Sequence, residues 1–264
     1  MVQTKLLSYW GIEGIDGVAG ENIPAYGALI ETKDLVNVVR IAFQNVNGLK
    51  LGNERAGAAE LDAMNQLGID IMGMAETNLS WTREKKLQLA ALAKIAFDGT
   101  SRCIASSTTS NKEGYLPGGT AMITRGPVSG RVQAQGADPF GRFTWMALRG
   151  REDSGVLIIT AYRVGQRKGV KAGPTTAYSQ QWVEMRKKGI ENPDPRNSIL
   201  EDISTLIYEW GEKGFHPLVM LDANATQDER QFSDFIDRDM TSRILYLKLM
   251  KGFHHQRMNE GPRK

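Results

Sequence analysis

The sequence predicts an α/β protein in which a mixed sheet is covered by helices, and three observations support this prediction. Short apolar runs rich in β-branched residues recur along the chain. Segments whose apolar residues follow a helical spacing separate several of these runs. Two further runs lie on either side of a short polar turn, which is typical of a hairpin. Because strand-helix-strand units favour parallel pairing and hairpins require antiparallel pairing, we expect a mixed sheet.

Each predicted element has its own local signal. Leu35–Phe43 is β-branched and precedes an Asn-Gly turn signal, and Gly68 lies where a helix would end. Ser198 is the predicted N-cap of the last helix. In chain order the prediction is strand Leu35–Phe43, helix Glu54–Leu67, strand Ile69–Ala75, helix Thr82–Phe97, strands Cys103–Ser107 and Gly118–Ile123, hairpin Phe143–Leu148 with Val156–Tyr162, helix Ile199–Lys213 and strand Pro217–Leu221.

Composition narrows the class of protein. The 264 residues are 41% hydrophobic, which is enough for a sizeable core. A net charge of +3 is compatible with a polyanionic partner but does not require one. The single cysteine, Cys103, excludes a disulfide framework and a cysteine-based zinc site. Without a run of about 20 apolar residues or a secretory signal, we expect an intracellular protein with no membrane partner, the nucleus being one candidate compartment.

Polar residues stand at the ends of four predicted strands, namely Asn45, Glu76, Tyr162 and the pair Asp222 and Asn224. Taken singly, each has an ordinary structural explanation as a turn former, a capping acid or an edge aromatic. Strand ends at one edge of a sheet are neighbours in space, however, and ligands gather at such edges. Clustered carboxylate and amide oxygens are the donors that Mg²⁺ requires.

Five segments containing these residues follow one another in a characteristic order: Phe43–Leu49, Met74–Thr77, Gly118–Ala121, Ala161–Arg163 and Leu221–Ala225. In this order and spacing, over residues 36–240, the chain resembles the endonuclease/exonuclease/phosphatase superfamily. The closest likeness is to the endonuclease domains of eukaryotic non-LTR retroelements, which Thr176–Trp182 and the dipeptide Pro195-Arg196 also resemble.

The resemblance implies a four-layered α/β sandwich of two packed mixed sheets flanked by helices, with the active site at one end. It also implies phosphoester hydrolysis with Mg²⁺ or Mn²⁺. The implied roles are metal ligand for Glu76, metal or phosphate orientation for Asn45, phosphate donor for Tyr162, alignment or deprotonation of water for Asp222, and transition-state support for Asn224.

The chain departs from the family pattern after Asp222. Members of the family continue with an Arg-Ile-Asp-Tyr-like motif and a Ser-Asp-His motif. Here Ser242–Leu247 carries Leu245 where the acid belongs, and no Asp-His pair occurs in the sequence. We therefore expect a C-terminally truncated copy whose last strands are missing and whose catalysis is impaired. Residues 1–35 are expected to form a flexible arm, and residues 241–264 a basic tail.

A basic segment follows the hairpin, and we expect Arg163, Arg167 and Lys168 to contact phosphates of a nucleic acid, with DNA as the first choice. The alternative is a solvated charged loop. Two other functions remain open: a catalytically inactive remnant that binds nucleic acid, and a phosphatase acting on a soluble phosphate ester. The retroelement-like segments argue against the phosphatase. The sequence leaves the oligomeric state open.

Overall fold

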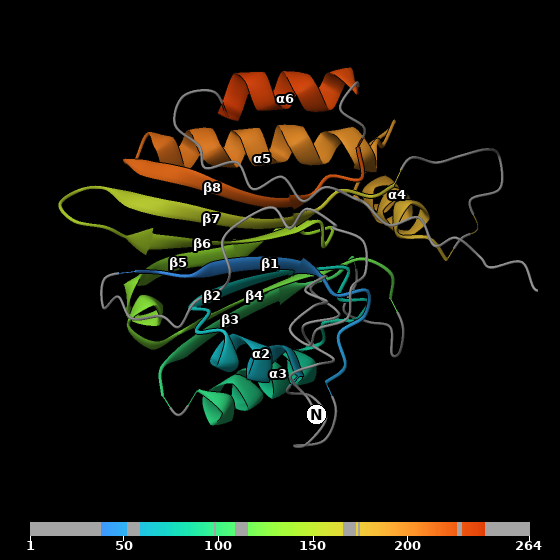
Figure 1. Cartoon of the computed structure of the whole chain (residues 1–264). Coiled ribbons are helices and arrows are strands. Elements are labelled where there is room, and N and C mark those ends of the chain that lie inside the picture. Colours follow the sequence, from blue (N-terminus) through green and yellow to red (C-terminus); the bar gives the residue numbers. More distant parts are fainter. Residues whose placement is uncertain are drawn as a thin grey trace, which may run out of the picture.

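Two four-stranded sheets stack face to face, with helices on both outer sides (Figure 1). The computed structural model describes residues 38–51, 59–97, 99–108, 116–165, 173, 175–225 and 229–240. The elements are β1 (Ile41–Asn45), α2 (Ala59–Gln66), β2 (Ile71–Ala75), α3 (Arg83–Ala96), β3 (Ser101–Ser106), β4 (Thr120–Arg125), the 3₁₀ helix η1 (Gly126–Arg131), β5 (Val132–Ala137), β6 (Phe143–Arg149), β7 (Gly155–Tyr162), α4 (Ala177–Lys187), α5 (Pro195–Gly211), β8 (Phe215–Asp222) and α6 (Arg230–Met240).

Both sheets are mixed. The first has the order β1-β2-β4-β3, in which β1 and β2 are parallel and the other pairs are antiparallel. The second has the order β5-β6-β7-β8, in which β7 and β8 are parallel and the other pairs are antiparallel. The predicted α/β class is thereby confirmed. The residue pattern alone predicted one sheet, whereas the structure has the two packed sheets that the resemblance implied.

The two sheets pack directly on each other through a layer of apolar side chains. Ile71 and Met122 of the first sheet lie in one cluster with Ile158 and Met220 of the second. Gly73 of β2 is needed for this close approach, because a Cβ there would lie 2.4 Å from Thr160 Oγ1. The glycine therefore lets β2 lie against the second sheet.

The outer faces are buried by helices. Met72 and Met74, which alternate with the inward residues of β2, pack with residues of α2 and α3 such as Leu61 and Leu89. On the second sheet, α5 covers the strands, and α6 packs against α5 from outside (Figure 1). The order of layers is therefore α2 and α3, the first sheet, the second sheet and α5, with α6 packed on the outer side of α5.

Several elements were not predicted or begin elsewhere. Strand β5 and helices α4 and α6 were not predicted, and α4 lies inside the stretch described from the sequence as a basic segment. Helix α5 begins at Pro195 with Asp194 as its N-cap, so the predicted Ser198 cap is wrong. The Asp194 carboxylate accepts hydrogen bonds from the Arg196 and Asn197 amides at 3.1 and 3.2 Å. Ser198 Oγ instead donates to the Asp194 carbonyl oxygen at 2.7 Å.

The expected N-terminal arm (1–35) and basic tail (241–264) lie outside the described residues. Within the part of the chain that the structure describes, no helix has the length and apolar character needed to cross a bilayer.

Candidate functional site

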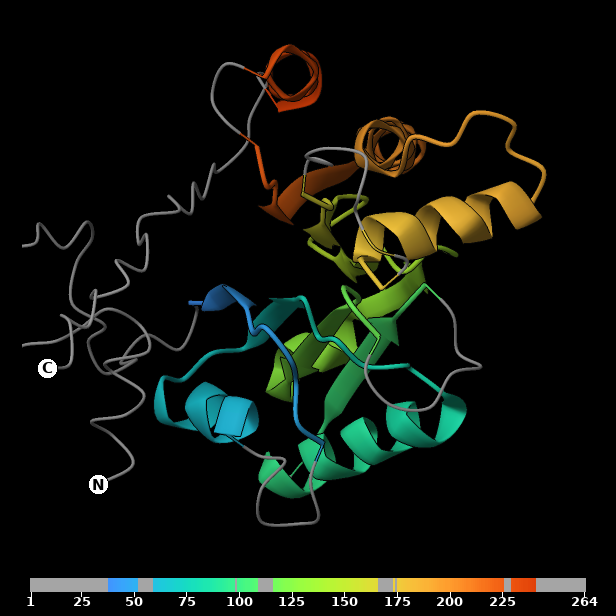
Figure 2. The ribbon, with the colours of Figure 1, turned by 90° about the vertical axis from the view of Figure 1, so that its right-hand side faces the viewer.

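The ends of β1, β2, β7 and β8 meet at one end of the molecule. In Figure 1, β1 and β8 both run toward the right, and Figure 2 looks onto that end. Asn45 is opposite Ala75 in the parallel pair of the first sheet, and Tyr162 is opposite Asp222 in that of the second. Ala75 and Tyr162 lie in the same apolar cluster, so the two pairs of strand ends are adjacent.

A hydrogen bond between side chains joins the two sheets at this end. Asn45 Nδ2 donates to Asp222 Oδ2 at 2.7 Å, across 177 positions of sequence. The Asn45 amide is oriented by a second bond, because its Oδ1 accepts from the Asn47 backbone amide at 3.0 Å. Both partners are half-buried. Two residues that the sequence singled out separately are therefore in direct contact.

Glu76 follows Ala75 directly, next to the Asn45 end of β1. Its carbonyl oxygen accepts from the Gly48 amide at 2.8 Å, which ties the loop after β1 to the end of β2. Among the residues that the structure describes, none forms an ion pair or hydrogen bond with its half-buried carboxylate. Glu76 thus has a carboxylate without a partner among the described residues, one position beyond the Ala75–Asn45 strand pair.

The loops that follow these strands contain unusual backbone. Asn47, Glu76, Asn78 and Asn224 have φ angles of 44°, 52°, 52° and 45°, in the left-handed region that non-glycine residues rarely adopt. These are four of the five described non-glycine residues with positive φ. Such backbone costs free energy and persists where surrounding structure enforces it, which is common at functional sites.

Tyr162 lines the same end as a largely buried side chain. Its ring lies in a cluster with Ala75, Val164 and Ala177. A Cβ on Gly118, whose φ is +85°, would be 3.4 Å from the Tyr162 ring. Asn78 Oδ1 accepts from the Gly118 amide at 2.8 Å, so the glycine loop before β4 is held against the tyrosine.

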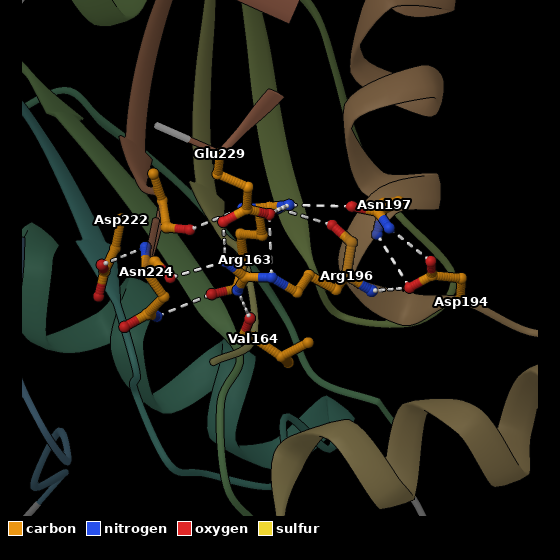
Figure 3. A network of polar contacts seen from close by, with 9 residues as sticks. Arg163, Val164, Asp194, Arg196, Asn197, Asp222, Asn224 and Glu229 are labelled. Atoms are coloured by element: carbon orange, nitrogen blue, oxygen red, sulfur yellow. Dashed lines mark hydrogen bonds and ion pairs between the residues drawn. The ribbon is translucent and has the colours of Figure 1, made fainter. Parts of the chain in front are cut away.

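Asn224 shapes the loop after β8. Its Nδ2 donates to the Arg163 carbonyl oxygen at 2.7 Å, and its backbone amide points to Asp222 Oδ1 at 3.4 Å. The Arg163 amide in turn donates to the Asp222 carbonyl oxygen at 2.9 Å. Figure 3 shows Asp222, Asn224 and Arg163 next to one another in this network of contacts. The side-chain nitrogen of Asn224 therefore binds the backbone that follows β7.

Arg163 is fully buried, with 0% of its surface exposed. Its Nε donates to the Arg196 carbonyl oxygen at 2.7 Å, and its Nη2 donates to Asn197 Oδ1 at 2.9 Å and to the Glu229 carboxylate. Burial lowers the pKa of Arg163, and the hydrogen bond to Glu229 opposes that shift. This placement gives Arg163 a different role from the phosphate contact expected from the sequence. Arg167 and Lys168 lie outside the described residues.

Two residues of this site region were missed by sequence reasoning as functional candidates. Arg196 had one signal, its place in the Pro-Arg dipeptide before the last predicted helix. Glu229 had none, because it belongs to a short polar run between β8 and α6. Their importance depends on contacts between segments far apart in the chain.

The oxygen atoms available at this end of the molecule are of the kind that binds a hydrated divalent cation. No group of three or more His, Cys, Asp or Glu that could hold a metal occurs among the described residues. The site offers two carboxylates, Glu76 and Asp222, together with the Asn45 amide. Mg²⁺ keeps several of its water molecules and is commonly held by one or two carboxylates, so this oxygen-only set suits it.

Comparison with known proteins gives only distant structural likenesses. No protein-family model matches the chain, and no curated protein matches its sequence. Similar solved structures include an AP endonuclease from Leishmania major (TM-score 0.46, 14% identity, 76% of this chain and 66% of that chain), an AP endonuclease from Archaeoglobus fulgidus (0.38, 14%, 76% and 71%) and an endonuclease/exonuclease/phosphatase family protein from Leptotrichia buccalis (0.33, 12%, 60% and 65%). The match thus covers slightly less than two thirds of the Leishmania and Leptotrichia proteins, and at these TM-scores the likenesses carry no argument about function.

Proposed function

We propose that this chain is a divalent-metal-dependent phosphodiester hydrolase whose active site is the shared end of β1, β2, β7 and β8. The observation that carries the proposal is the 2.7 Å hydrogen bond from Asn45 to Asp222, which joins the two sheets at the strand ends where Glu76 follows Ala75. Polar residues that converge from distant segments on strained loops are the arrangement expected of a catalytic site.

In this proposal Glu76 and Asn45 hold Mg²⁺ or Mn²⁺. When bound there, such a cation supplies electrostatic stabilisation for the negative charge that develops on phosphoryl oxygens. Asp222 aligns the attacking water and accepts its proton, and the hydrogen bond from Asn45 fixes the orientation of that carboxylate. Tyr162 donates to the phosphate, and Asn224 supports the transition state while holding the loop on which Asp222 lies.

The proposed substrate is nucleic acid, and DNA in particular. The sequence pI near 8.9 suits a polyanion, and the motif order resembles that of retroelement endonucleases. Action on DNA is consistent with an intracellular protein, with the nucleus as a candidate compartment.

A second candidate is a binding module that retains the nucleic-acid surface without turnover. One observation favours it. His216, the one histidine within the described residues, lies at the opposite end of β8 from Asp222, and the sequence contains no Asp-His pair. Without an acid/base histidine among the described residues of the site, turnover is expected to be slow, because catalytic residues that act as a unit fail together.

Cleavage of supercoiled plasmid with Mg²⁺ or Mn²⁺ separates these candidates. We expect slow, metal-dependent nicking by the purified chain, and a loss of about 10²-fold or more in Asp222→Asn, since a general base contributes about that much. Lys94→Gln, on the far helix α3, is the control. Salt-sensitive DNA binding without nicking would favour the binding module. Hydrolysis of a soluble phosphate ester without nicking would favour a phosphatase.

A further inference from the structure

Two arginine side chains hold the loop that carries Asp222. Arg163 Nη1 donates to the carbonyl oxygen of Ala223 at 3.4 Å. Arg196 Nη2 donates to the carbonyl oxygen of Asn224 at 2.8 Å. These are the carbonyl groups of the two residues that immediately follow Asp222, so both arginines hold the backbone next to its carboxylate.

The same arginines bind the neighbouring elements. Arg163 Nε donates to the carbonyl oxygen of Arg196 at 2.7 Å, at the first turn of α5. Arg196 Nη1 donates to the carbonyl oxygen of Val164 at 2.5 Å, just after β7. The pair therefore fastens the end of β7, the loop after β8 and the start of α5 to one another (Figure 3).

Glu229 is the counter-ion for both. Its Oε1 accepts from Arg163 Nη2 and, at 3.2 Å, from Arg196 Nε, and its Oε2 accepts from Arg196 Nη2. Within the described part of the chain, the ion pairs of Arg163 and Arg196 are both with this carboxylate. Hydrogen bonds from Arg163 hold the pKa of Glu229 below its ordinary value, against the opposing effect of burial.

The two cations need that carboxylate because they are buried side by side. Arg163 and Arg196 are only 0% and 7% exposed. Burial lowers the pKa of Arg163, and the charge of Arg196 lowers it further, as a nearby like charge does. Removing the shared counter-ion leaves two buried guanidinium groups that repel each other, and we expect this repulsion to weaken their hydrogen bonds to the loop after Asp222.

We propose that Glu229 is a positioning residue of the active site, which sets the place of Asp222 through Arg163 and Arg196. The inference rests on the proposed function in its catalytic part, because positioning matters for activity only if Asp222 acts there. A displacement of about 1 Å at a reacting group can cost about 10²-fold in rate. The neighbouring Arg142 group provides a matched comparison. There Asp202 of α5 also pairs with a buried arginine, but Asp138 remains as a second partner.

The first test is hydrogen exchange, which does not require activity. In Glu229→Gln, the amides of Arg163 and Asn224 are expected to exchange about tenfold faster, because the loop they belong to opens locally. Glu229→Asp keeps the charge on a shorter side chain and is expected to limit the increase to about threefold. Asp202→Asn is expected to leave both amides unchanged. If Glu229→Gln does not fold, the threefold change in Glu229→Asp, confined to the same amides, carries the test.

The second test is plasmid nicking by the same variants. We expect kcat to fall by about 10²-fold in Glu229→Gln, with little change in the Mg²⁺ concentration needed for half-maximal rate, and to recover substantially in Glu229→Asp. Unchanged exchange at Arg163 and Asn224, or equal acceleration throughout β7 and β8, would overturn the positioning role. Should the wild-type chain not cleave at all, the proposed function fails, while the exchange result still decides the role of Glu229.

Discussion

In the first sheet, the chain beyond β1 and β2 is held by backbone hydrogen bonds and left-handed residues, whereas in the second sheet the chain beyond β7 and β8 is held by buried charges. The Gly48 amide donates to Glu76, and the Thr77 and Asn78 amides donate to the Gly119 and Gly118 carbonyl groups. In the second sheet, the ion pairs of Arg163 and Arg196 with Glu229 hold the loops after β7 and β8.

This difference shows how a site divides its tasks. The first sheet leaves the Glu76 carboxylate without a protein partner among the described residues, which suits the metal ligand of the proposed function. The second sheet fixes the loop after Asp222 through side chains, which suits the water-aligning residue of that proposal. We call the loops after β1 and β2 the backbone half of the site and the loops after β7 and β8 its charged half. The backbone half is predicted to be sensitive to changes in backbone conformation, and the charged half to changes in charge.

Gly118→Ala tests the backbone half and has the largest expected effect on stability. Gly118 has a φ of +85°, where a Cβ is strained by about 1–2 kcal/mol, and the new atom would also lie 3.4 Å from the Tyr162 ring. We expect Tm to fall by about 2–8 °C. Gly130→Ala is the matched control, because it has ordinary φ and open space around the added Cβ. Equal effects of the two changes would contradict the role given to the glycine loop.

Acid titration tests the charged half, with a smaller expected effect. The pKa of Glu229 lies below its ordinary value of 4.5, so the stability it contributes is fully present above that pH and is lost as pH falls through its folded pKa. The difference in unfolding free energy between the wild type and Glu229→Gln should therefore be constant from about pH 7 to 5 and shrink below 4.5. Urea unfolding at several pH values measures it. A difference that did not shrink as pH fell below 4.5 would mean that the charge of Glu229 is not the cause.

The sequence predicted the backbone half of the site better than the charged half, for a physical reason. The run Ile69–Ala75, which contains β2, is apolar and bounded by turn residues, so its strand and the polar residue at its end could be recognised locally. Strand β5, with the sequence VQAQGA, has too few apolar side chains to give that signal.

The charged half depends on contacts between distant segments. Arg163 and Glu229 are 66 positions apart, and neither position has a local pattern that predicts burial. A basic residue after a strand is ordinarily exposed, which is why Arg163 was expected to contact phosphates. The side-chain contact between Asn45 and Asp222 likewise became visible only when the two sheets were seen to pack together.

The proposed function depends on the binding of a divalent cation by Glu76 at the shared end of the two sheets. The most direct test is the increase in Tm caused by Mg²⁺ or Mn²⁺, since a ligand that binds only the folded chain stabilises it by about 2.7 kcal/mol at 100 times its Kd. We expect the increase in the wild type and in Glu152→Gln, an exposed acid with the same left-handed backbone, and its loss in Glu76→Gln. An unchanged increase in Glu76→Gln would contradict the claim.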